Sequence, residues 1–171
     1  MVNNAGIVSG KNYLEVSDFM IQKTFEVNSM GILYTVREFV PDMLKKNKGH
    51  IVNISSLSSF ASPPGLSEYG GSKAAATIID ETLRLEFKKI GANITTTCIC
   101  PYFINTGMFD GAKMSWPFQV LDQHYVAWRI LTAVKQEENL VILPWICNIT
   151  FLFKCFFPPP VVDYIGWLFG A

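Results

Sequence analysis

Hydrophobic positions along this chain follow two spacings, one typical of helices and one typical of buried strands. The first long segment with helical spacing covers residues 18–46, and it ends in lysines followed by a glycine. We expect this helix to bend near Asn28 or Gly31, because asparagine and glycine are weak helix formers. A further bend is expected at Pro41, which has no backbone N–H to donate.

Three short apolar runs predict buried strands, at residues 50–56, 92–101 and 139–144. Two further segments with helical spacing separate these runs, at residues 67–90 and 122–138. Strands that alternate with helices in this way are typical of a parallel sheet whose crossover connections are helical. The pattern therefore predicts an α/β fold.

The sequence opens with the letters MVNNAG, in which two apolar residues are followed by Asn3, Asn4, Ala5 and Gly6. Asparagine and glycine tolerate the left-handed backbone of a tight turn, so this run is a turn signal. We therefore expect the first residues to be the end of a strand, with the turn directly after it.

Composition narrows the class of protein further. The 171 residues are enough for one domain, 50% are hydrophobic, 16% are charged, and the formal net charge is zero. Without a basic patch, a nucleic-acid partner has no electrostatic support. The four cysteines, Cys98, Cys100, Cys147 and Cys155, lack metal-binding spacing, so we expect reduced core cysteines and no metal site.

The last segment, residues 145–171, differs from the rest because apolar and aromatic side chains fill it. Its uncharged stretch is too short to span a bilayer comfortably, and Pro144 interrupts it. We therefore divide the chain into a partial α/β domain, residues 1–144, and this apolar aromatic segment. The segment can lie in a membrane interface or pack against the sheet, and the sequence leaves both open.

One pair of residues indicates acid–base chemistry. Tyr69 and Lys73 lie one turn apart on one face of the predicted helix. An ammonium stabilises a phenolate, so we expect Lys73 to lower the pKa of Tyr69 and fit it for proton transfer. Ser56 ends the preceding strand, where its hydroxyl can hold a substrate oxygen. Ser55, which faces the other side of the strand, is the competing serine. An exposed helix pair without a catalytic role is the alternative interpretation.

Five motifs occur in order along the chain: NNAG, VNSMG, IVNISS, YGGSK and CPYFINTGM. In this combination the sequence resembles the short-chain dehydrogenase/reductase family from Val2 to about Leu143. Within the family it is most similar to the subgroup of retinol dehydrogenases and lipid-droplet hydroxysteroid dehydrogenases. The resemblance implies the C-terminal part of a doubly wound, Rossmann-like parallel sheet with flanking helices, with the family's first three strands missing.

The resemblance also implies four catalytic residues. Tyr69 would be the general acid/base, and Lys73 would lower its pKa and bind the nicotinamide ribose. Ser56 would orient the substrate oxygen. Asn28 would hold a water that relays protons between Lys73 and solvent.

The family's cofactor is NAD or NADP, and the resemblance implies which residues would bind it. Besides Tyr69 and Lys73, these are Asn4, Ala5 and Gly6 at the adenosine half and Pro101, Ile104 and Thr106 at the nicotinamide. Many relatives have a glycine where this sequence has Tyr102. The family's glycine-rich phosphate motif does not occur in these 171 residues, so the choice between NAD and NADP stays open.

Together these implications predict an NAD(P)-dependent oxidoreductase that acts on the CH–OH group of a lipophilic alcohol, such as a retinoid or steroid. Residues 107–118 would be the lid over the substrate. The alternative is a truncated pseudo-enzyme without the phosphate motif, at most a membrane- or dimer-associated fragment. A homodimer or heterodimer would form through helices 18–46 and 67–90. The subgroup implies an endoplasmic reticulum or lipid-droplet surface facing the cytoplasm, with the cytoplasm itself as the alternative.

Overall fold

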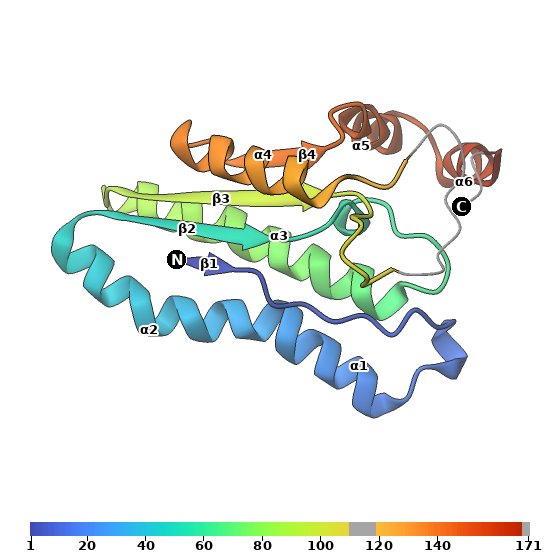
Figure 1. The fold of residues 1–171 in the computed structure, drawn as a ribbon, viewed down its shortest axis with the longest axis horizontal. Coiled ribbons are helices and arrows are strands. Elements are labelled where there is room, and N and C mark those ends of the chain that lie inside the picture. Colours follow the sequence, from blue (N-terminus) through green and yellow to red (C-terminus); the bar gives the residue numbers. More distant parts are fainter. Residues whose placement is uncertain (110–118, 169–171) are drawn as a thin grey trace.

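The computed structural model describes residues 1–109 and 119–168, which form a four-stranded parallel sheet with flanking helices (Figure 1). The strands lie side by side in sequence order: β1 Val2–Asn3, β2 Gly49–Ile54, β3 Ile94–Pro101 and β4 Leu140–Leu143. All neighbouring pairs are parallel. This arrangement confirms the predicted α/β fold, including the short strand end at Val2.

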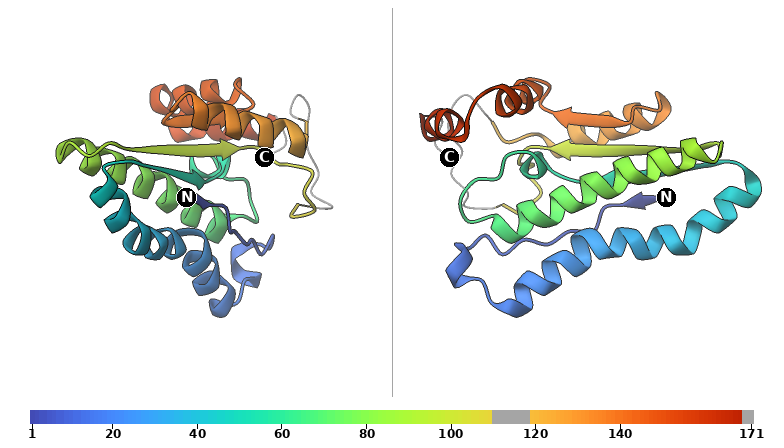
Figure 2. Two further views of the ribbon diagram at one scale, coloured as in Figure 1. Left: turned by 60° about the vertical axis from the view of Figure 1, so that its left-hand side comes forward. Right: turned by 180° about the vertical axis from the view of Figure 1, so that it is seen from behind.

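Helices connect the strands and continue beyond the last one. In chain order the long helices are α1 Asp18–Phe25, α2 Gly31–Lys46, α3 Ser67–Lys89, α4 Gln123–Lys135, α5 Cys147–Phe156 and α6 Pro159–Leu168. The short helical segments are η1 Tyr13–Glu15, η2 Glu26–Met30 and η3 Leu57–Ser59. Both further views show α4 on the opposite side of the sheet from α2 and α3 (Figure 2).

The core lies on both faces of the sheet, and two neighbouring residues of β2 show how. Ile51 is buried against α2 and α3, where it joins Val36 and Ala76. Val52 points to the other face and is buried against Val126 of α4. Successive strand residues face opposite sides of a sheet, so a strand covered on both faces needs apolar residues at consecutive positions.

The predicted helix 18–46 is divided in the structure into α1, η2 and α2. The segment η2, Glu26–Met30, is one turn of π-helix, and it contains the expected bend position at Asn28. Single π turns widen a helix locally and are frequent at functional sites. Pro41 lies inside α2, which continues beyond it to Lys46.

A chain of buried and half-buried polar side chains joins β1 to the rest of the sheet. The Asn3 side chain accepts a hydrogen bond from Thr35 Oγ1 at 2.8 Å and donates one to Asn53 Oδ1 at 2.7 Å. Asn53 donates to Asp80 Oδ1 at 2.6 Å, and Thr96 donates to Asp80 Oδ2 at 3.0 Å. Burial raises the pKa of Asp80, and these two hydrogen bonds oppose the rise. The network therefore fixes the two-residue strand through side chains as well as backbone.

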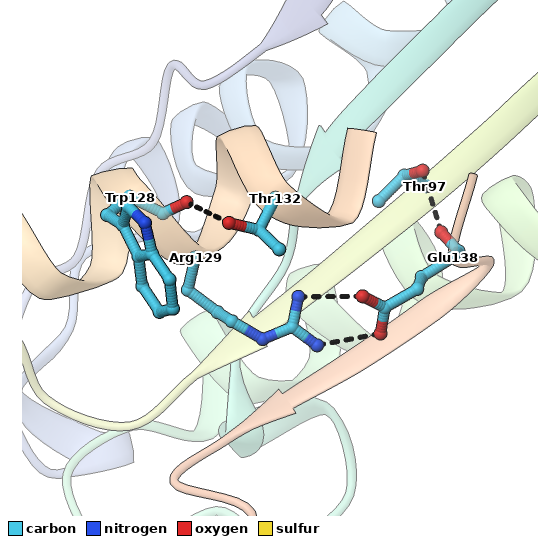
Figure 3. A network of polar contacts seen from close by, with 5 residues as sticks. All are labelled: Thr97, Trp128, Arg129, Thr132 and Glu138. Atoms are coloured by element: carbon cyan, nitrogen blue, oxygen red, sulfur yellow. Dashed lines mark hydrogen bonds and ion pairs between the residues drawn. The ribbon is translucent and has the colours of Figure 1, made fainter. Parts of the chain in front are cut away.

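A salt bridge fixes the turn between α4 and β4 (Figure 3). The two terminal guanidinium nitrogens of Arg129, Nη1 and Nη2, donate to the Glu138 carboxylate at 2.8 and 2.7 Å. The Glu138 carbonyl in turn accepts a hydrogen bond from Thr97 Oγ1 on β3, at 2.7 Å. The bidentate geometry holds the middle of α4 to the turn that precedes β4.

The start of the aromatic segment after β4 packs on the sheet. Cys147 at the start of α5 is buried with Cys98 and Cys100 of β3. Lys154 of α5 donates a hydrogen bond to the Phe60 carbonyl. All four cysteines are free, but Cys155 is exposed, so the prediction that it lies in the core is wrong. It follows Lys154 on α5, and only part of this helix surface faces the core.

The outward faces of α2 and α3 carry large apolar side chains. Those exposed to solvent include Leu33, Tyr34, Phe39, Ile78 and Leu85. Exposed apolar side chains in neighbouring helices are typical of faces that pair with another chain. Dimer formation through residues 18–46 and 67–90 remains a prediction.

The loop between β2 and α3 approaches the first turns of α3 very closely. A Cβ on Gly70 would lie 2.5 Å from Ser62 Oγ and 3.2 Å from the backbone carbonyl oxygen of Ser58. A Cβ on Gly71 would instead meet only the tip of the Phe25 ring, at 3.2 Å. Glycine at position 70 therefore sets how near the loop can come to the helix.

We expect Gly70→Ala to lower the free energy of unfolding by about 1–3 kcal/mol, because the loop backbone must move to admit the methyl group. Urea denaturation monitored by circular dichroism measures this change. Gly71→Ala is the matched control on the same helix. The Phe25 ring can turn aside there, and alanine favours the helix by up to about 1 kcal/mol. Equal destabilisation by both substitutions would contradict the steric explanation.

Candidate active site

The candidate catalytic residues gather at the carboxyl edge of the sheet. Because the strands are parallel, β1, β2 and β3 all end at this edge, and the segments that follow them meet there. Gly6 follows β1, Ser56 follows β2, and the first two turns of α3 carry Tyr69 and Lys73. Asn28 reaches the same place from the π turn between α1 and α2.

Lys73 is buried at the centre of this group, with 3% of the residue exposed. Its Nζ donates a hydrogen bond to the carbonyl oxygen of Ile54, the last residue of β2, at 2.8 Å. Burial lowers the pKa of Lys73 to about 8, because the ammonium loses its hydration shell. Gly6 lies so near that a Cβ on it would be 3.3 Å from Lys73 Nζ.

Tyr69 lies beside Lys73 and is 4% exposed. Lys73 Nζ is 5.8 Å from the centre of the Tyr69 ring. Burial raises the pKa of Tyr69, and a side-chain hydrogen bond with Ser56 opposes the rise only in part. The net direction is therefore opposite to the sequence-based expectation, because removing a phenolate from water costs more than its neighbours return.

The two serines after β2 have different surroundings. Ser55 Oγ donates to the Lys73 carbonyl oxygen at 2.9 Å and lies 2.7 Å from Thr77 Oγ1. Its hydroxyl is therefore used to hold α3 on the sheet. Ser56 Oγ accepts from the Ser58 backbone N–H at 3.1 Å and interacts with Tyr69. Of the two, Ser56 is the serine that interacts with Tyr69. Strand alternation requires only that the two serines face opposite sides.

Asn28 joins three segments through its side chain. Its Oδ1 accepts a hydrogen bond from the Ile7 N–H at 2.8 Å, and its Nδ2 donates to the Ile7 carbonyl oxygen at 2.9 Å. The same Nδ2 donates to Ser72 Oγ on α3, also at 2.9 Å. These contacts bind the loop after β1 to α3. The expected role of Asn28 in holding a water molecule stays a prediction.

The residues expected at the cofactor lie along the same edge in different settings. Asn4 and Ala5 are exposed on the loop after β1. Pro101 is buried at the end of β3, whereas Thr106 is exposed. Ile104 pairs with Leu121 in an isolated parallel bridge, and its carbonyl accepts from the Thr106 N–H at 2.8 Å. Within the described residues, Gly6 is the member of this set that directly adjoins Lys73.

Aromatic rings form a wall next to the Tyr69 side chain. The rings of Tyr69 and Phe109 meet edge to face with centres 5.9 Å apart. Phe109 packs in the same way on Phe103 at 4.6 Å, and Phe103 on Tyr102 at 4.8 Å. The wall gives the site an apolar side. Phe109 is the one ring of this group that belongs to the expected lid, residues 107–118, whose positions 110–118 lie outside the described residues.

Sequence reasoning did not find two residues that help to build the site. Ser72 bridges Asn28 and the Tyr69 carbonyl oxygen, to which its hydroxyl donates at 2.7 Å. Glu68 accepts hydrogen bonds from Ser9, a residue far away in the sequence. For Ser72 the available signal was its place in the YGGSK motif three residues after Tyr69, since residues three or four apart share a helix face. No local spacing pointed to the contact between Glu68 and Ser9.

Comparison with known proteins places the chain in a family. Residues 1–115 match the family model described as short chain dehydrogenase. The chain is 39% identical to short-chain dehydrogenase/reductase family 16C member 6 of Bos taurus, over 90% of this chain and 50% of that protein. It is 35% identical to human epidermal retinol dehydrogenase 2, over 98% of this chain and 57% of that protein. Rat 17-beta-hydroxysteroid dehydrogenase 13 is 34% identical, over 97% and 55% of the two chains.

Solved structures support the same fold. A short chain dehydrogenase from Burkholderia cenocepacia in complex with NADP has a TM-score of 0.80 at 22% identity, covering 99% of this chain and 70% of that one. One from Burkholderia phymatum in complex with NAD has a TM-score of 0.77 at 24% identity, covering 90% and 64%. The chain spans about half the length of the curated relatives it matches. On the family model and these identities, the chain belongs to the short-chain dehydrogenase/reductase family.

Proposed function

We propose that this chain carries the catalytic residues of an NAD- or NADP-dependent oxidoreductase that acts on the CH–OH group of a lipophilic alcohol. The main support is the convergence of Ser56, Tyr69 and Lys73 at the carboxyl edge of the sheet, with Gly6 against Lys73. Such a site, with a hydroxyl, a phenol and a cation held together in a buried place, is suited to moving a proton on and off a substrate oxygen.

The residues present fit the nicotinamide end of the proposed cofactor. Lys73 has three N–H donors, and among the described residues the Ile54 carbonyl accepts one of them, which leaves the others for ribose hydroxyls. Gly6 adjoins Lys73 without a side chain of its own, which leaves room that any larger residue would fill. Two of the structural relatives are described as complexes with NAD or NADP.

The proposed chemistry divides the work among three side chains. A bound nicotinamide dinucleotide supplies the carbon that accepts or donates hydride. Ser56 Oγ holds the substrate oxygen, and Tyr69 Oη takes its proton or returns it. Because burial raises the pKa of Tyr69, proton uptake there depends on the charge of Lys73. The lowered pKa of Lys73, about 8, places this charge change close to neutral pH.

Two observations favour a lipophilic substrate. The aromatic wall of Tyr102, Phe103 and Phe109 stands next to Tyr69, and it offers rings to an apolar molecule. The similar proteins named above include a retinol dehydrogenase and a hydroxysteroid dehydrogenase. A retinoid or a steroid is therefore the substrate class that we propose.

We also propose that the aromatic segment rests on a lipid surface, from which such a substrate would come. Its large side chains are exposed: Trp145, Ile146, Ile149, Leu152, Phe156, Phe157, Val161 and Tyr164. Tryptophan and tyrosine suit the boundary between headgroups and acyl chains. Among the described residues, no helix is both long and apolar enough to cross a bilayer. An endoplasmic reticulum or lipid-droplet surface would fit this mode of attachment.

Tyr69→Phe tests the proposed acid–base role. The ring and its contact with Phe109 are kept, so the Kd for NADH or NADPH, measured by fluorescence titration, should change far less than turnover. Oxidation of a retinol or a 17β-hydroxysteroid should fall by about 10²–10⁴-fold, because the proton-transferring hydroxyl is gone. Tyr125→Phe on α4 is the matched control. If neither dinucleotide binds, the proposed function fails, while binding without turnover by the parent protein would support the pseudo-enzyme.

Lys73→Met tests the buried ammonium through stability. The folded-state pKa of Lys73, about 8, lies below its ordinary value of 10.5, so the unfolded chain binds more protons between these values. Below pH 8 Lys73 therefore contributes no pH-dependent gain in the free energy of unfolding, and this free energy increases as the pH rises above 8. Between pH 8 and 9.5 the parent protein should gain about 1.5–2 kcal/mol relative to Lys73→Met in urea denaturation. Lys88→Met, an exposed change on α3, is the control, and parallel curves for all three proteins would contradict the expectation.

Removing two aromatic side chains tests the lipid surface. A Trp145→Ser/Phe156→Ser variant should bind phosphatidylcholine vesicles at least about tenfold more weakly in a sedimentation assay, because it loses the apolar area that would be buried. Trp128→Ser, which removes an exposed tryptophan from α4, is the matched control and should bind normally. Equal binding by the double variant and the parent protein would show that these side chains do not contact lipid.

A further inference from the structure

Glu68 is a buried acidic residue that the chemistry proposed above does not use. It lies in the first turn of α3, immediately before Tyr69, and is 4% exposed. Its Oε1 accepts two hydrogen bonds from Ser9, from Oγ at 2.5 Å and from the backbone N–H at 3.2 Å. Its Oε2 is buried and has no hydrogen-bond partner among the described residues. Burying a carboxyl group is costly, so the contact with Ser9 must matter to the fold or to the site.

Ser9 belongs to the loop between β1 and η1, residues 4–12, which has no helix or strand of its own. The loop is held at successive points. Gly6 lies against Lys73, and the backbone of Ile7 is bound by Asn28. Glu68 then binds Ser9, just before Gly10 turns the chain with a φ of +66°. Side-chain anchors at these points replace the backbone hydrogen bonds that a regular element would provide.

The bond to Glu68 fixes the loop to the same helix that carries Tyr69 and Lys73. A short hydrogen bond from a hydroxyl to a carboxyl group is among the stronger kinds, and two donors from one residue also fix its orientation. An acidic side chain in the first turn of a helix is favoured by the helix dipole. The anchor is therefore rigid, and it sets the distance between the loop and the catalytic helix.

We propose that Glu68 is a positioning residue: its bonds to Ser9 hold the loop 4–12 on α3 and so keep Gly6 in place against Lys73. The effect of this anchor on activity rests on the proposed function, in which the loop faces the nicotinamide dinucleotide. Loss of the anchor should then weaken dinucleotide binding more than it slows the chemical step. A residue that served only overall stability would not weaken dinucleotide binding more than it slows the chemical step.

Hydrogen exchange measures the anchor without any need for activity. In Glu68→Ala, the amides of Ile7 and Ser9 should exchange at least about tenfold faster, because the loop opens more often. Amides of β3 should keep their rates. Glu68→Gln keeps an acceptor oxygen for Ser9, and it loses no hydrogen bond at Oε2, which has no partner among the described residues. The amides of the loop should therefore exchange nearly as slowly in this variant as in the parent protein. Unchanged loop exchange in Glu68→Ala would overturn the proposal.

Two further variants control for general destabilisation. Asp122→Ala removes a carboxylate that likewise accepts backbone N–H bonds, from His124 and Tyr125, but at the start of α4. It should leave the loop unchanged. Ser9→Ala removes the hydroxyl donor from the other side of the contact, and it should release the loop even if Glu68→Ala folds poorly. Slow loop exchange in Ser9→Ala would also contradict the anchor.

Dinucleotide titration and kinetics test the link to function. We expect the Kd for NADH or NADPH to rise at least about tenfold in Glu68→Ala, while kcat at saturating dinucleotide changes less than about threefold. Glu68→Gln should restore binding. If the parent protein binds no dinucleotide but the loop is released as expected, the anchor stands and the proposed function fails. If the loop is released and the Kd is unchanged, Glu68 is a structural anchor only and its positioning role is overturned.

Discussion

The site depends on how closely other segments can approach the first two turns of α3. Gly70 lets the loop after β2 come within contact of the helix, and Gly71 does the same for Phe25. One turn further along, Lys73 meets Gly6 from the loop after β1. Three segments from distant parts of the sequence therefore meet on one short stretch of helix. Small residues at the points of contact allow this, because a Cβ would already separate the surfaces.

Burial gives the site its electrostatic character. The pKa of Lys73 is lowered and that of Tyr69 is raised, and desolvation is the largest cause of both shifts. Both groups are thereby displaced toward their neutral forms, so the two shifts have the same physical origin. The Ile54 carbonyl offsets part of the cost for Lys73. A bound molecule that brings negative charge or hydroxyl groups would change this balance, which is why binding and proton transfer are coupled in the proposed chemistry.

The aromatic segment after β4 packs in the protein without burying all of its large apolar side chains. Cys147 and Lys154 attach it to the sheet and to the loop after β2, so part of it packs in the protein. Trp145 and Phe156 remain among its most exposed described side chains, and their contact with lipid is a proposal. The composition of the segment could not distinguish packing against the sheet from contact with a membrane, because it does not say which helix surface meets the core.

The sequence by itself determined the parallel α/β fold, the helix face that Tyr69 and Lys73 share, and the opposite directions of Ser55 and Ser56. These follow from local periodicity, because strand and helix spacing fixes which side chains face the same way. Only the tertiary structure decided the upward pKa shift of Tyr69 and the contact between Glu68 and Ser9. Desolvation and long-range hydrogen bonds depend on which segments cover a residue in space, and no spacing along one element contains that information.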